Sequence, residues 1–141
     1  MNTSNCGATV LRRGAQSLAE LAETMRKDLA AGQEQDALRL IFGFADDFRG
    51  SSDAGKALLI AGEPAPTGDS GFDALLAGTA EFFAREAGLP APAWVNGPRR
   101  FAVPWYFVAA STGLHAYVLA HTPVTFGRHG VFMAEEVFSR A

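Results

Sequence analysis

Residues 70–90, SGFDALLAGTAEFFAREAGLP, have the pattern of a long buried helix. Their large apolar side chains follow the three- and four-residue spacing of one helical face. They belong to Phe72, Leu75, Leu76, Phe82 and Phe83. Ser70 is a residue type that caps helices, with Asp73 at the third position. Gly88 followed by Pro90 marks the end, so the stretch predicts an α-helix with a broad buried face.

Three more helices are predicted before this one. Ser17 and Glu20 have the spacing of a capping box, and Gly32 ends the helix that they begin. A second helix is predicted over about residues 34–49. It is apolar over much of its circumference, which is typical of a helix that packs against two neighbours. After a Gly-Ser-Ser break, a short third helix is predicted over residues 54–61.

The pattern changes after residue 90. Four prolines lie between residues 90 and 104 and forbid a continuous helix. The aromatic side chains of this segment still need cover, so we expect them to press onto the helices. They are Trp94, Phe101, Trp105, Tyr106 and Phe107. A fifth helix is predicted over about residues 112–121, a turn over 123–130, an extended stretch over 131–133 and a last helical turn over 134–140.

Together these elements predict a mostly α fold. We expect a compact single-domain helical bundle of about five helices, with an irregular Pro- and aromatic-rich crossing segment and little β structure. Residues 1–16 lack hydrophobic periodicity and are expected to form a flexible leader. Residues 17–141 are expected to form one helical domain, because the chain of 141 residues has the length of a single domain.

The composition excludes several classes of protein. The chain has 12 Lys and Arg against 15 Asp and Glu, and its net charge of -3 argues against direct binding to nucleic acid. Its one Cys excludes a disulfide framework and a thiolate metal cluster. Arg12 and Arg13 interrupt any signal-peptide core, and no apolar run reaches the length of a membrane span. We therefore expect a cytoplasmic protein that does not bind membranes.

No motif predicts catalysis, a cofactor or a metal. Residues 68–71, GDSG, resemble the nucleophile signature of trypsin-like proteases, but the chain is too short and too helical for that double-barrel fold. His115, His121 and His129 lack the four-residue spacing that places two imidazoles on one helical face. The sequence therefore predicts no catalytic residue, no cofactor and no metal ligand.

Charge is distributed unevenly along the chain. Residues 62–96 carry one Arg against five acidic residues, whereas residues 97–141 carry four Arg against two Glu. The basic residues that lie near aromatic ones are Arg99, Arg100, Arg128 and His129, with Phe126 expected beneath them. Two interpretations stay open. These residues form a patch that binds a protein partner or a phosphate, or the Arg side chains pair internally with the acidic fourth helix.

Short motifs in a fixed order along residues 35–135 resemble those of a known family. They are Pro64-x-Pro66-Thr67-Gly68-Asp69, Asp73-Ala74-Leu75-Leu76-Ala77, Leu89-Pro90-x-Pro92-x-Trp94, Arg100-Phe101, Trp105-Tyr106-Phe107, Pro123-x-x-Phe126 and Arg128-His129-Gly130-Val131-Phe132. The family consists of small proteins of high-GC, actinobacterial-type bacteria. Its members look like the antitoxin-side partners of nucleotidyltransferase-type toxins, and longer members carry an Xre-type helix-turn-helix.

This chain departs from the family pattern in two places. Residues 1–34 offer one helix rather than the paired helices of a helix-turn-helix, so autoregulation by DNA binding is not expected. The turn from Phe126 to Gly130 is less basic than in relatives, because Gly127 carries no charge.

The resemblance and the lack of a catalytic motif together predict a non-enzymatic, antitoxin-like factor that binds a cognate toxin and occludes its active site. The predicted partner-binding residues are Arg99, Arg100, Phe126, Arg128 and His129, whereas Trp94 and Trp105 are expected in the core. The alternative is a small-molecule or nucleotide-binding domain, or an enzyme, with an anion site built from Arg100, Arg128 and His115. A homodimer with the first helix as its seam stays open.

Overall fold

The computed structural model describes residues 11, 14–102, 105–108 and 115–133, and its fold is mostly α, as the sequence predicts. The helices are α1 (Leu18–Ala30), α2 (Glu34–Arg49), α3 (Asp53–Ala61), α4 (Ser70–Ala87), the 3-10 helix η1 (Ala93–Asn96), α5 (His115–His121) and α6 (Val124–Gly127). The strands are β1 (Tyr106–Phe107) and β2 (Val131–Phe132). None of the helices within these ranges is long and apolar enough to cross a membrane.

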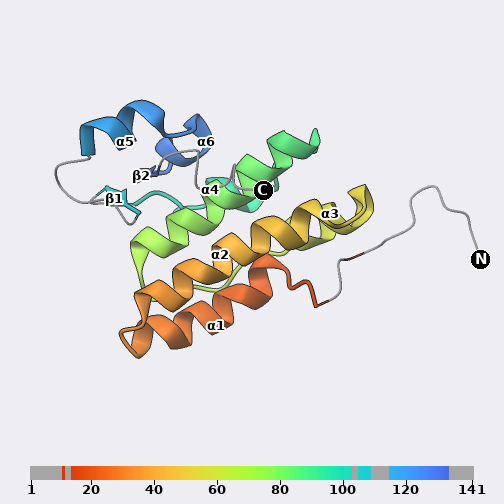
Figure 1. The fold of residues 1–141 in the computed structure, drawn as a ribbon, viewed down its shortest axis with the longest axis horizontal. Coiled ribbons are helices and arrows are strands. Elements are labelled where there is room, and N and C mark those ends of the chain that lie inside the picture. Colours follow the sequence, from red (N-terminus) through yellow and green to blue (C-terminus); the bar gives the residue numbers. More distant parts are fainter. Residues whose placement is uncertain (1–10, 12–13, 103–104, 109–114, 134–141) are drawn as a thin grey trace, which may run out of the picture.

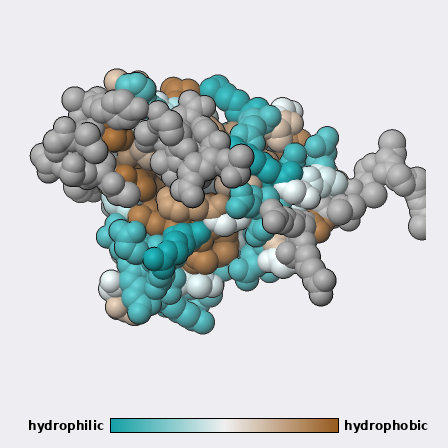
Figure 2. All heavy atoms as spheres, viewed as in Figure 1, coloured by the Kyte–Doolittle hydropathy of each residue, from teal (hydrophilic) through white to brown (hydrophobic). Residues whose placement is uncertain are grey.

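Helix α4 lies in the middle of the fold. In Figure 1 the helices α1, α2 and α3 lie on one side of it, and α6 and β2 contact it from the other. This position explains why most residues of α4 are buried. Figure 2 shows the molecule from the same side as Figure 1. Hydrophobic residues lie in the middle of this view, where the C-terminal elements meet the helical part of the fold.

Side chains at the helix starts satisfy backbone N–H groups that have no partner within the helix. Ser17 and Glu20 form the predicted capping box: the Ser17 hydroxyl accepts from the Glu20 backbone at 3.1 Å, and the Glu20 carboxylate accepts from the Ser17 backbone at 2.8 Å. The predicted cap of α4 is wrong by one residue. Asp69 is the cap and accepts from the Phe72 backbone at 3.0 Å, because Asp caps as well as Ser70 does.

The C-terminal elements are joined by a two-stranded parallel sheet. The Tyr106 backbone donates to the Gly130 carbonyl at 2.8 Å, and the Val108 backbone donates to the Phe132 carbonyl at 2.9 Å. Gly130 has φ of +78°, and a Cβ there would lie 2.7 Å from the Ala102 carbonyl oxygen. Only glycine therefore fits this turn without strain. The extended stretch predicted at residues 131–133 is β2, whereas β1 was not predicted.

The expectation that Trp105 lies in the core is wrong. Successive residues of a strand point to opposite faces. Tyr106 points inward, its ring 5.6 Å from that of Phe72, and its hydroxyl donates to Glu34 at 2.7 Å; burial raises the pKa of Tyr106. Trp105 consequently points outward and is 62% exposed, with its ring 4.9 Å from that of Phe132.

Some predictions lie outside the described residues. They concern most of the leader, the start of the fifth helix at residues 112–114 and the last helical turn over residues 134–140.

Candidate functional site

Arg100 is fully buried, which corrects its prediction as a surface contact. Its guanidinium lies over the Trp94 ring, 4.8 Å from the ring centre. It donates to the carbonyl oxygens of Asp73 at 3.1 Å and Pro64 at 2.7 Å, and it lies 3.4 Å from the Glu63 carboxylate. Burial lowers the pKa of Arg100, and the hydrogen bond to Glu63 opposes this shift. Arg100 therefore links α4 to the loop that precedes it.

His129 is also fully buried, so its prediction as an exposed contact is corrected in the same way. Its Nδ1 contacts the Arg100 carbonyl oxygen and its Nε2 contacts the Glu81 carboxylate. One face of the imidazole stacks on Phe101, with ring centres 4.8 Å apart. His129 thus connects its own turn to α4, through Glu81, and to the segment that contains Arg100 and Phe101.

Arg128 fits both interpretations that the sequence left open, a surface contact and an internal ion pair. Its Nε lies 3.3 Å from the Glu81 carboxylate on α4, and its Nη2 donates to the Asn96 side chain. This is the predicted internal pairing with the acidic fourth helix. About a third of the side chain nevertheless stays exposed, and the guanidinium lies 5.7 Å from the centre of the Phe101 ring.

Three exposed side chains lie in this region. Phe101 is 40% exposed and contacts Arg128, and Trp105 lies against the Gly130 turn that follows Arg128. We call Phe101, Trp105 and Arg128 the Arg/aromatic surface. Arg99 keeps its predicted exposure, because half of its side chain is accessible and its pairing with Glu63, at 3.9 Å, is loose.

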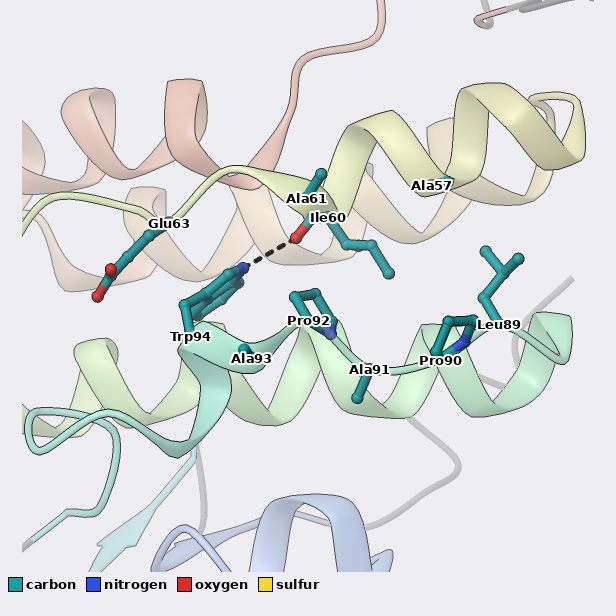
Figure 3. A pocket seen from close by; sticks show the side chains of 10 residues that line it. All are labelled: Ala57, Ile60, Ala61, Glu63, Leu89, Pro90, Ala91, Pro92, Ala93 and Trp94. Atoms are coloured by element: carbon teal, nitrogen blue, oxygen red, sulfur yellow. Dashed lines mark hydrogen bonds between the residues drawn. The ribbon is translucent and has the colours of Figure 1, made fainter.

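A second feature is an apolar groove of about 550 Å³ between α3 and residues 89–94 (Figure 3). The Trp94 indole donates to the Ile60 carbonyl at 3.0 Å and so joins the two walls. Glu63 lies at one end. A groove of this volume has the size of a small-ligand site. Sequence reasoning missed it, because it exists only once α3 packs beside residues 89–94.

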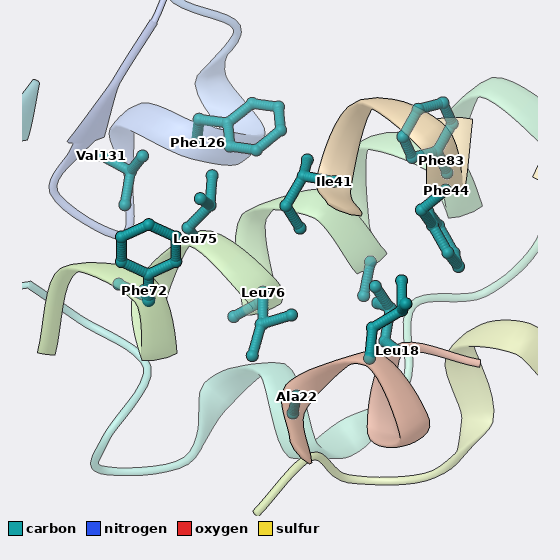
Figure 4. Close-up of a cluster of buried hydrophobic side chains, with 14 of the residues drawn as sticks. Leu18, Ala22, Ile41, Phe44, Phe72, Leu75, Leu76, Phe83, Phe126 and Val131 are labelled. Carbon is teal, nitrogen blue, oxygen red and sulfur yellow. The ribbon is translucent and has the colours of Figure 1, made fainter. Parts of the chain in front are cut away.

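Phe126 is fully buried, as the sequence predicts for a residue beneath the basic ones, and it therefore makes no surface contact. Figure 4 shows its ring above α4, near Leu75 and Val131. A Cβ at Gly78 would lie 2.5 Å from Phe126 Cδ1, which is too close for any real contact. The lack of a side chain at Gly78 thus creates the recess that Phe126 fills.

The alternative prediction, an anion site built from Arg100, Arg128 and His115, is wrong for the two arginines. The guanidinium groups of Arg100 and Arg128 pair with different carboxylates, those of Glu63 and Glu81, and do not converge on one anion. The His115 side chain lies outside the described residues. No group of His, Cys, Asp and Glu residues in the described part of the chain can hold a metal ion.

Comparisons with protein-family models, with curated proteins and with solved structures find no match to this chain. The family resemblance therefore rests on the sequence motifs, and the candidate site rests on geometry.

Proposed function

We propose that this protein is a non-enzymatic, antitoxin-like factor of the bacterial cytoplasm that binds a cognate toxin of the nucleotidyltransferase type and covers its active site. The observation that carries the proposal is the Arg/aromatic surface. It presents two large aromatic rings and a guanidinium group to solvent. Trp and Arg are among the residue types that contribute most of the binding energy at protein interfaces.

The residues beneath the surface support this role. Phe101 stacks on the buried His129, and Arg128 is held by Glu81 and Asn96. Side chains that are already fixed before binding lose little conformational entropy when a partner arrives. The Arg/aromatic surface is therefore a preorganised contact, with Arg99 as a further predicted one.

The class of toxin comes from the family resemblance. Two of the motifs that carry the resemblance, residues 105–107 and 128–132, contribute Trp105 and Arg128 to the Arg/aromatic surface. The segments whose motifs carry the family resemblance are thus the segments that contribute exposed side chains to the Arg/aromatic surface.

Trp105→Ala is expected to weaken binding to the toxin about 30-fold, because truncation of a Trp at the centre of an interface costs about 2 kcal/mol. Leu58→Ala is the matched control, since Leu58 is also apolar and 54% exposed but lies on α3. Each variant is co-expressed with the product of the adjacent gene, isolated by size-exclusion chromatography and titrated by calorimetry. The proposal is contradicted if the wild-type protein forms no complex or if the two variants bind equally well.

The apolar groove favours a second candidate function, the binding of a small aromatic or aliphatic molecule. A ligand that binds only the folded state raises Tm by mass action. We expect a thermal-shift screen of such compounds to find ligands of the wild-type protein that no longer act on Ala57→Leu, because Ala57 lines the groove. Ligands that act equally on both proteins do not bind in the groove.

A further inference from the structure

The groove between α3 and residues 89–94 lies on a part of the surface that carries no charge. Residues 57–62 and 89–98 contain no charged side chain. Single exposed apolar residues are normal on a protein surface, but a group of neighbouring ones marks a contact with another molecule. We call this group the α3 face. Its exposed members are Ala57, Leu58, Ala61, Pro90, Ala91 and Ala93.

Leu58 is the large side chain of the α3 face, and it lies beside the groove. It is 54% exposed, and its neighbours Ala57 and Ala61 both line the groove. The groove, with a volume of about 550 Å³ and several alanines in its walls, has room for a leucine side chain. A protrusion beside a recess is self-complementary, because a two-fold axis between them places each protrusion in the recess of the other copy.

The charges at the two ends of α3 fit the same arrangement. A two-fold axis perpendicular to the helix makes its two copies antiparallel. Lys56 directly precedes the uncharged residues 57–62, and Glu63 directly follows them. Antiparallel pairing therefore brings Lys56 of each copy to Glu63 of the other. Glu63 is half exposed, and among the described residues its ion pairs with Arg99 and Arg100 both use Oε2, so Oε1 is open to a further cation.

We propose that this protein forms a two-fold dimer through the α3 face, with Leu58 of each copy in the groove of the other and Lys56 paired with Glu63 across the axis. This places the seam on α3 and not on the first helix. None of the three residues of the Arg/aromatic surface lines the groove. The dimer goes beyond the proposed function, because it leaves that surface uncovered on both copies and so presents it twice.

The dimer is tested without the toxin, by analytical ultracentrifugation of the full chain from about 1 µM to about 500 µM, which brackets weak dimers. Small interfaces give weak association, so we expect a Kd on the order of 10 µM. Leu58→Glu should raise this Kd at least about 100-fold, because a charge enters an apolar groove at both symmetric contacts. Leu119→Glu is the matched control: Leu119 is 42% exposed on α5, and the same change there should leave the Kd unchanged.

Lys56→Glu tests the antiparallel orientation. It sets like charges against each other at both ends of the interface, so the Kd should rise about tenfold. Adding Glu63→Gln removes the charge that Lys56→Glu faces and should recover most of the loss. A protein that stays monomeric over the whole range overturns the inference, and so does a dimer that survives Leu58→Glu, since it uses another surface. Toxin binding decides the proposed function separately, because Leu58→Ala weakens the dimer and leaves the Arg/aromatic surface of each copy intact.

Discussion

Replacement of Arg100 with methionine is expected to lower the free energy of unfolding by about 3 kcal/mol. Methionine fills much of the same volume but leaves the buried carbonyl oxygens of Pro64 and Asp73 without their donors. A buried polar group that loses its partner costs roughly 1–3 kcal/mol. Urea denaturation followed by circular dichroism measures the effect.

Arg99→Met is the matched control for this experiment. The two arginines are neighbours, but Arg99 is half exposed, and its Nη2 lies 3.9 Å from the Glu63 carboxylate. Substitutions at exposed positions usually change the free energy of unfolding by less than about 0.5 kcal/mol. Equal effects of the two substitutions would show that Arg100 does not link α4 to the preceding loop.

Replacement of Phe126 with alanine is expected to cost about 3–5 kcal/mol, the range found when a buried Phe is truncated in a packed core. The ring fills the recess at Gly78 and lies 5.6 Å from the ring of Phe82, so its loss leaves a cavity between α6 and α4. Val124→Ala, on the same short helix but exposed, should change the stability little. Urea denaturation of both variants measures the difference.

The same contact is tested from its other side by Gly78→Ala. The added methyl group overlaps the Phe126 ring, and overpacking of this kind costs about 1–3 kcal/mol. Combination of Gly78→Ala with Phe126→Leu should cost less than the sum of the two single changes, because the smaller side chain relieves the overlap. Additive costs would contradict a direct contact between these positions.

The helices could be predicted because their signals are local. A capping box at Ser17, glycines after the helices and apolar residues at helical spacing define α1, α2, α3 and α4 within a few residues. The cap of α4 was misplaced by one residue because Asp69 and Ser70 are adjacent and cap equally well.

The β1 strand could not be predicted in this way. It has two residues, and its pairing with β2 depends on a turn at Gly130 that brings together segments about 25 residues apart. This pairing also makes Trp105 point outward and Tyr106 point inward. Composition and proline spacing do not predict which of the two side chains is buried.

Of the three residues of the Arg/aromatic surface, the sequence predicted only Arg128 as a partner contact, and it did not separate exposed from buried neighbours. Arg99 and Arg100 are adjacent and chemically identical, yet one is half exposed and the other fully buried over Trp94. The difference arises because Arg100 reaches two carbonyl oxygens, that of Pro64 in the loop before α4 and that of Asp73 on α4. His129 and Arg128 differ in the same way, although both contact Glu81 on α4: the imidazole is fully buried, and about a third of the Arg128 side chain stays exposed. These partners lie 27 to 48 residues away in the sequence.

The central proposal, that this protein neutralises a toxin by covering its active site, is tested most directly by titration of the toxin's nucleotidyl transfer activity with the purified protein. Transfer is expected to fall in proportion to the protein added and to stop at equimolar amounts, and Trp105→Ala is expected to require a large excess. Unchanged transfer by toxin that is fully bound would contradict the proposal.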